Sequence, residues 1–203
     1  FCCEGYDARK SFLEDIFMAE KDETVVKALK WCVENGDATT QFYALRFLLN
    51  FPRHPGIEPL MKKFLSHPQY HLRLPPIFWY ARQKKAFIVP HILEQFNQSP
   101  IHGHVAIHAL FNFTGPKTLS AYVNLTRERQ YHLWQLIEKG MGVIARKYPS
   151  RVAALLDDPD IEVRKKALAA LNGHLPPKSP VYKKIRPFLY HPDIVVALLA
   201  FET

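Results

Sequence analysis

Apolar residues recur along this chain at helical spacing, and the run over residues 161–171 is the clearest example. Its apolar residues fall on one face of a helix and its charged residues on the other. Asp158 or Asp160 precedes the run and can accept a hydrogen bond from the first free backbone N–H groups. Asn172-Gly173 follows it and favours the left-handed turn that ends many helices. The pattern therefore predicts a helix over residues 161–171 with both ends specified.

A proline-containing segment recurs about every thirty-one residues, which is the strongest internal repeat of the chain. Residues 64–69, 155–160 and 188–193 share an apolar pair, two small or polar residues, then Pro and a polar residue. Proline lacks the N–H that a helix interior needs but is tolerated in a first turn, so each proline marks a joint between helices. The anchors are Val33, Leu65, Asn97, Leu125, Leu156 and Leu189, at intervals of 32, 32, 28, 31 and 33 residues.

These joints divide the chain into six units, each with a first helix and a shorter second helix. The second helices are expected at Ile57–Phe64, Phe87–Phe96, Lys117–Leu125, Pro149–Leu156 and Pro180–Leu189. A single helical hairpin cannot bury its apolar stripe, whereas stacked hairpins join their stripes into one core. The repeat therefore predicts an all-α solenoid of about six helical hairpins, forming one domain over residues 1–203.

The stretch from Leu155 to Leu175 resembles a HEAT repeat, with its apolar pair, Asp-Pro-Asp, Val-Arg and Ala-Leu-Ala-Ala-Leu. The resemblance implies a right-handed superhelix whose second helices line a concave surface that binds other macromolecules. Two units depart from the pattern. Pro75-Pro76 falls inside an expected first helix, and residues 127–129 read Arg-Glu-Arg where a proline is expected.

Composition agrees with a folded helical protein. Of the 203 residues, 48% are hydrophobic, which is enough to bury a core, and only 8 are glycine. No uninterrupted apolar stretch is long enough to span a membrane as a helix.

The two ends of the sequence lead to predictions about a longer parent chain, the compartment and further packing. The chain begins at Phe1 and not at Met, so we expect a fragment or a processed part of a longer protein. The compartment stays open: the cytoplasm is slightly favoured, and a lipid-anchored periplasmic form is the alternative because Cys2 and Cys3 lie beside the N-terminus. Residues 194–201 are nearly all apolar, so we expect the remainder of a parent chain, or a partner, to pack there.

Positive charge is concentrated in the larger, C-terminal part of the chain. Residues 1–60 carry 7 Lys or Arg against 10 Asp or Glu, whereas residues 61–203 carry 20 against 9. Cations on or near second helices could attract an acidic protein or phosphates, and an exposed ring next to them could add affinity. The candidate binding residues are Lys62, Lys63, Trp79, Lys84, Lys85, Lys117, Arg151, Lys183, Lys184 and Arg186.

The sequence offers no catalytic constellation. His104 and His108 have the i, i+4 spacing of two metal ligands on one helix, and His102 is nearby. No carboxylate lies near them in sequence to complete a metal site. HExxH, GxSxG and phosphate-loop motifs are missing, and so are the His-Glu pairs of HEAT-like hydroxylases. We therefore predict no enzyme activity, no catalytic or metal-binding residue and no cofactor. His67, His71, His174 and His191 lie at joints, where we expect them to bond to exposed helix carbonyls.

The resulting hypothesis is a protein–protein interaction scaffold that uses the concave surface of a helical-repeat solenoid. The alternative is nucleic-acid binding, or HEAT-like DNA glycosylase activity, through a basic groove. A lyase or chaperone that handles a small cofactor has only the functional breadth of such folds in its favour.

Overall fold

The computed structural model describes residues 23–96 and 98–203, and every regular element within these ranges is a helix. The predicted all-α class is confirmed for this part of the chain. The chain divides into two compact units, residues 1–91 and residues 92–203, which are described separately here. The expectations for Cys2 and Cys3 lie outside the described residues.

Unit 1 is built around the helices α3 and α5. Helix α2 (Glu23–Asn35) packs against α3 (Ala38–Leu48), and both α3 and α4 (Glu58–Phe64) contact α5 (Leu74–Arg82). Two 3-10 helices, η1 (Tyr70–Arg73) and η2 (Ala86–Ile88), flank α5, and α6 (Val89–Phe96) begins in unit 1 and ends in unit 2. The fully buried side chains include Leu29, Leu45, Leu48, Ile57, Met61, Leu72, Ile77 and Tyr80.

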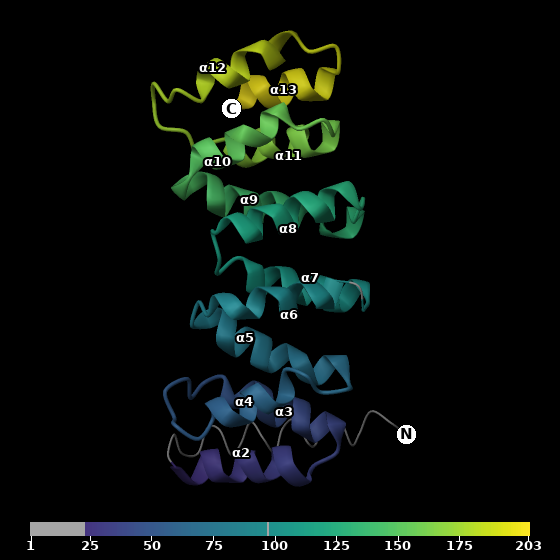
Figure 1. The fold of residues 1–203 in the computed structure, drawn as a ribbon, viewed down its shortest axis with the longest axis vertical. Coiled ribbons are helices and arrows are strands. Elements are labelled where there is room, and N and C mark those ends of the chain that lie inside the picture. Colours follow the sequence, from purple (N-terminus) through teal and green to yellow (C-terminus); the bar gives the residue numbers. More distant parts are fainter. Residues whose placement is uncertain (1–22, 97) are drawn as a thin grey trace. The chain divides into compact units, whose positions relative to one another are not determined.

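Unit 2 contains the remaining helices, and their packing partners lie close by in the sequence (Figure 1). They are α7 (Pro100–Leu110), α8 (Pro116–Arg127), η3 (Tyr131–Leu133), α9 (Trp134–Lys147), α10 (Pro149–Ala153), η4 (Ala154–Asp157), α11 (Ile161–Leu171), α12 (Tyr182–Ile185), η5 (Arg186–Tyr190) and α13 (Ile194–Glu202). Helix α9 contacts α7, α8, α10 and α11, and α11 in turn contacts α13. None of the helices in the described ranges has both the length and the hydropathy needed to cross a bilayer.

Proline positions agree with the prediction that they mark joints. Prolines occupy the first turn of α4, α5, α7, α8 and α10. Pro75-Pro76 is therefore compatible with a helix, because α5 begins at Leu74 and the two prolines fall in its first turn. The predicted helix over residues 161–171 is confirmed as α11, which Asp160 caps and which is followed by Gly173 at a φ of +67°.

Four joints share one local turn in which the residue before proline bonds to the residue after it. The backbone N–H groups of Gly56, Gln69 and Asp193 donate to the Nδ1 atoms of His54, His67 and His191. At the fourth joint the N–H of Asp160 donates to Asp158. The expectation that His67 and His191 bond to helix carbonyls is therefore wrong, because the Nδ1 atom of each ring accepts a hydrogen bond from a backbone N–H group.

Helices α5 and α8 both end in a left-handed turn that contains no proline. The residue after the cap has a left-handed φ of 56° in both cases, at Lys84 after α5 and at Arg129 after α8. Paired backbone hydrogen bonds close each end: Lys84 and Lys85 donate to α5, and Arg129 and Gln130 donate to α8. The Arg-Glu-Arg segment is therefore a helix-ending turn that replaces the proline joint.

Candidate functional site

A groove with a volume of about 400 Å³ lies between helices α9 and α11 of unit 2. The two helices run parallel, because Glu138 meets Lys166 near their first halves and Gly142 lies beside Ala170 near their second halves. The residues that line this α9/α11 groove are Gln135, Glu138, Lys139, Gly142, Val143, Arg146, Ala169, Ala170 and His174.

The floor of the groove is formed by small residues. Gly142 has no side chain, and Ala169 and Ala170 offer only methyl groups. A methyl group on Gly142 would come within 3.2 Å of His174 Nε2 and 3.8 Å of the Ala170 carbonyl oxygen. Gly142 and Ala170 are themselves buried, because the two helices approach closely here and His174 lies beside Gly142.

The charged residues of the groove leave it positive. The single carboxylate of the lining, Glu138, is paired with Lys166 at 3.1 Å, and Lys166 also lies 4.9 Å from the Trp134 ring centroid. Lys139 and Arg146 are exposed and have no acidic partner within ion-pair distance among the described residues. The α9/α11 groove therefore presents two cations and one neutralised acid.

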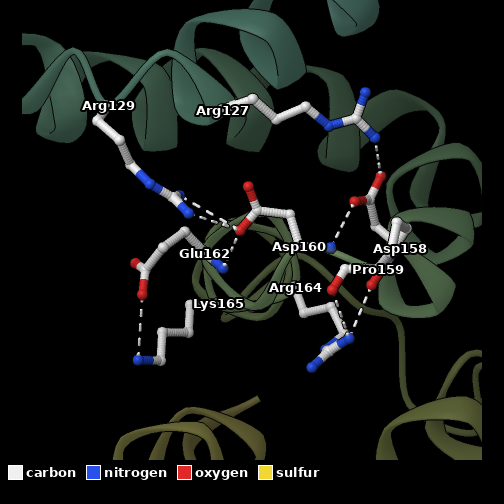
Figure 2. Close-up of polar contacts among 8 residues, drawn as sticks. All are labelled: Arg127, Arg129, Asp158, Pro159, Asp160, Glu162, Arg164 and Lys165. Atoms are coloured by element: carbon white, nitrogen blue, oxygen red, sulfur yellow. Dashed lines mark hydrogen bonds and ion pairs between the residues drawn. The ribbon is translucent and has the colours of Figure 1, made fainter.

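Two arginine–aspartate pairs fix the joint after α8 against the joint before α11 (Figure 2). Arg127 Nη2 lies 2.7 Å from Asp158 Oδ2, and Arg129 donates through Nη1 and Nη2 to Asp160 Oδ1 at 3.3 and 3.2 Å. The partners are 31 residues apart in both pairs, which is the period of the repeat. The departure from the repeat pattern at residues 127–129 thus supplies the cations that bind the next joint.

Asp160 also holds the start of α11, because it accepts the backbone N–H of Glu162 at 2.9 Å. Arg164 donates to the carbonyl oxygens of Asp158 and Pro159 from the next turn of the helix, as Figure 2 shows. One wall of the α9/α11 groove is therefore anchored at its N-terminal end by side chains of its own joint and of the preceding one.

A similar pair connects α11 to α13. Lys165 Nζ lies 2.8 Å from Asp193 Oδ2, and Asp193 caps α13 by accepting the N–H groups of Val195 and Val196. The hydrogen bond from Lys165 lowers the pKa of Asp193 below its ordinary value, and the two backbone hydrogen bonds act in the same direction.

This pair predicts a specific acid dependence of stability. Because the folded-state pKa of Asp193 is lowered, its charge stabilises the fold above its ordinary pKa of about 3.9 and stops doing so as the pH falls through the lowered value. The difference in unfolding free energy between wild type and Asp193→Asn should be constant near neutral pH and shrink below about pH 4. Urea unfolding at several pH values measures it, and a difference that persists unchanged into acid would contradict the pairing.

The nine predicted binding cations are all exposed. Lys62, Lys63, Lys84 and Lys85 belong to unit 1, and Lys117, Arg151, Lys183, Lys184 and Arg186 belong to unit 2. The charged groups of Arg151 and Lys184 contact other side chains of the chain.

Lys184 forms an ion pair with Asp157 at 2.6 Å, and the Arg151 guanidinium lies 4.2 Å from the Tyr148 ring centroid. Lys147 approaches the same ring at 5.1 Å. Lys184 is therefore partly neutralised by its own chain, in contrast to Lys117, Lys183 and Arg186.

Trp79 is not on a surface, which corrects its assignment as a binding residue. Its side chain is 3% exposed and packs edge-to-face against Tyr80, with ring centroids 4.8 Å apart. Most of the side chains of α5 are buried, because α3, α4, η1 and η2 all contact this helix. The three consecutive rings at residues 78–80 therefore lie in or near the core of unit 1.

The histidines His104 and His108 do meet on α7, with ring centroids 5.4 Å apart. Partial burial lowers the pKa of His108, and the nearby His104 and Lys139 lower it further. Within residues 23–96 and 98–203 no group of three His, Cys, Asp or Glu side chains is placed to hold a metal ion.

Lys139, Arg146 and His174 were not among the binding residues predicted from the sequence. That prediction placed binding on second helices, whereas these three residues line the groove between α9 and α11. The spacing of Lys139, Gly142 and Arg146, three and four residues apart, does place them on one helix face. The position of Ala169 and Ala170 opposite them could not be predicted, because it depends on how α11 packs against α9.

No protein-family model matches the chain, and no curated protein sequence is significantly similar to it. The described residues thus define an all-helical protein with a basic groove between two parallel helices.

Proposed function

We propose that this protein is a binding scaffold of stacked HEAT-like helical hairpins, and that its α9/α11 groove holds an acidic segment of a partner protein. The observation that carries the proposal is the charge of the groove: Glu138 is paired with Lys166, while Lys139 and Arg146 have no acidic partner in the described ranges. Cations at the rim of the groove select negative charge in the bound segment.

The ion pairs of unit 2 support the same preference for an acidic ligand. Six of its nine acidic residues are paired with cations of the unit: Glu138, Asp157, Asp158, Asp160, Glu162 and Asp193. Nine of its fourteen Lys and Arg residues have no ion pair to a described residue. Most acidic side chains of unit 2 thus form ion pairs within the unit, and the charge that remains for a partner is positive.

A charge-reversal comparison tests the proposal. The probe is a fluorescein-labelled synthetic peptide rich in Glu and Leu, and the readout is fluorescence anisotropy at moderate salt. Reversing Lys139 and Arg146 together to Glu should weaken binding by about tenfold or more. The matched control reverses Lys117 and Lys183 to Glu, which changes the net charge equally on second helices. That control should retain most of the affinity.

The two variants separate three outcomes. Loss only in the groove variant supports the α9/α11 groove. Loss only in the second-helix variant would move the binding surface back to the second helices, where the sequence analysis predicted it. Equal loss in both would mean that net charge alone attracts the peptide.

A second candidate function is nucleic-acid binding through α12 and η5. Tyr182 and Tyr190 are exposed there and flank the exposed cations Lys183 and Arg186 in sequence. Exposed rings beside cations are typical of surfaces on which unpaired bases stack. Binding of a labelled single-stranded oligonucleotide should then fall steeply with salt, and the single change Lys183→Glu should weaken it. Undetectable binding at low salt would eliminate this candidate.

A further inference from the structure

Another pocket of unit 2, with a volume of about 130 Å³, lies between α6 and α8. Its apolar walls are the side chains of Leu93 and Phe96 from α6 and of Ala121 and Leu125 from α8. All of these except Leu93 are buried. An apolar cavity of about 150 Å³ admits a molecule of benzene, so the α6/α8 pocket has room for a short aliphatic chain.

The polar side of the α6/α8 pocket is formed by Asn124 and Glu128 at the C-terminal end of α8. The two residues are four positions apart, which places them on the same side of the helix. Both side chains are exposed, and neither has a hydrogen-bond or ion-pair partner among residues 23–96 and 98–203. An amide oxygen and a carboxylate are therefore able to accept hydrogen bonds from a ligand at the mouth of the pocket.

The charge of Glu128 is not neutralised by the two arginines beside it in sequence. Arg127 and Arg129 are bonded to Asp158 and Asp160 of the next joint, at 2.7 and 3.2 Å. The C-terminal end of a helix also carries partial negative charge, because the aligned peptide dipoles end there. The mouth of the α6/α8 pocket therefore attracts a cation, whereas the α9/α11 groove attracts an anion.

An apolar pocket with a negative mouth fits a side chain that has an aliphatic stem and a positive end. Lysine has four methylene groups, which pack on apolar surface while the ammonium stays near water, and its ammonium has three hydrogen-bond donors. An acidic side chain would be repelled by Glu128. A purely apolar side chain would displace water from the carboxylate without replacing its hydrogen bonds, which is costly.

We propose that the α6/α8 pocket binds a lysine side chain of a partner protein. The methylene groups lie against Leu93, Phe96 and Leu125, and the ammonium donates to Glu128 and Asn124. This site goes beyond the proposed binding of an acidic segment and shares no residue with the α9/α11 groove. Either proposal can therefore fail alone.

Two small probes on the full chain test the need for a positive charge. They are N-acetyl-lysine methylamide, whose ends are blocked as in a peptide, and the norleucine compound, which has the same stem without the ammonium. In an NMR titration, the methyl signals of Leu93, Ala121 and Leu125 should show saturable shifts with the lysine probe at millimolar concentrations. The norleucine probe should bind about threefold more weakly or less, because it lacks the exposed ion pair.

Three variants of exposed residues locate the charge that matters. Glu128→Gln should weaken binding of the lysine probe by about threefold. Asn124→Asp adds a second carboxylate on the same side of α8 and should strengthen binding by about twofold or more. The matched control is Glu202→Gln on α13, which also removes one exposed carboxylate and should leave binding unchanged. The spectrum away from each substitution should stay that of the wild type.

Three results would overturn the proposal. The first is an absence of shifts at Leu93 and Leu125 with the lysine probe at millimolar concentration. The second is equal or tighter binding of the norleucine probe, which would mean that the pocket selects apolar side chains. The third is an equal loss of binding in Glu128→Gln and Glu202→Gln, which would mean that net charge alone attracts the probe.

Discussion

Replacing Gly140 with alanine should destabilise the protein by about 2 kcal/mol, although alanine is the better helix former by about 1 kcal/mol. Gly140 is buried in α9, and a methyl group there would lie 2.3 Å from Tyr122 Cζ and 2.4 Å from its hydroxyl oxygen. Tyr122 of α8 is itself fully buried, so its rigid ring has nowhere to move. Chemical denaturation of the purified variant measures the change.

Gly142→Ala is the matched control on the same helix. Its new methyl group would meet the imidazole end of His174 at 3.2 Å, and that side chain can turn away. We expect a stability change within about 1 kcal/mol of wild type. The double variant Gly140→Ala with Tyr122→Leu should cost less than the two single changes added, because they share one contact. If Gly140→Ala is as stable as wild type, the close approach of α8 and α9 is wrong.

Asp160→Ala should cost about 2 kcal/mol, because one carboxylate caps α11 and also binds Arg129. Removing it leaves the backbone N–H of Glu162 and the Arg129 guanidinium without this acceptor. Asp160→Asn keeps an oxygen that can cap the helix and should therefore cost less than half as much. Thermal and urea unfolding of the two variants, compared under identical conditions, give the difference.

Arg129→Gly separates the ion pair from the cap. It removes the cation but relieves a left-handed φ of 56°, which glycine adopts without strain. The Arg129 side chain is 40% exposed, so solvent screens its attraction to Asp160. We expect a net cost below about 1 kcal/mol, clearly smaller than that of Asp160→Ala. Equal costs would mean that the ion pair, and not the cap, holds the start of α11.

Local sequence specifies where several of the helices begin and end. The start of α11 at Ile161, its cap at Asp160 and the left-handed Gly173 after it could all be predicted, and prolines marked the first turns of other helices. These features depend on residues that are neighbours along the chain. Backbone groups at a helix end need partners within a few residues, so the local sequence is sufficient to specify them.

Which side chains meet and which stay exposed depends on how the helices pack against one another. Trp79 lies in the core because four other elements surround α5, and Lys184 is paired because Asp157 of the preceding joint lies within reach. The α9/α11 groove exists because Gly142 lies opposite Ala170. Each of these outcomes depends on the distance between helices separated by a loop or a whole repeat. That distance is set by the packing of every side chain between them, which periodicity in one helix does not specify.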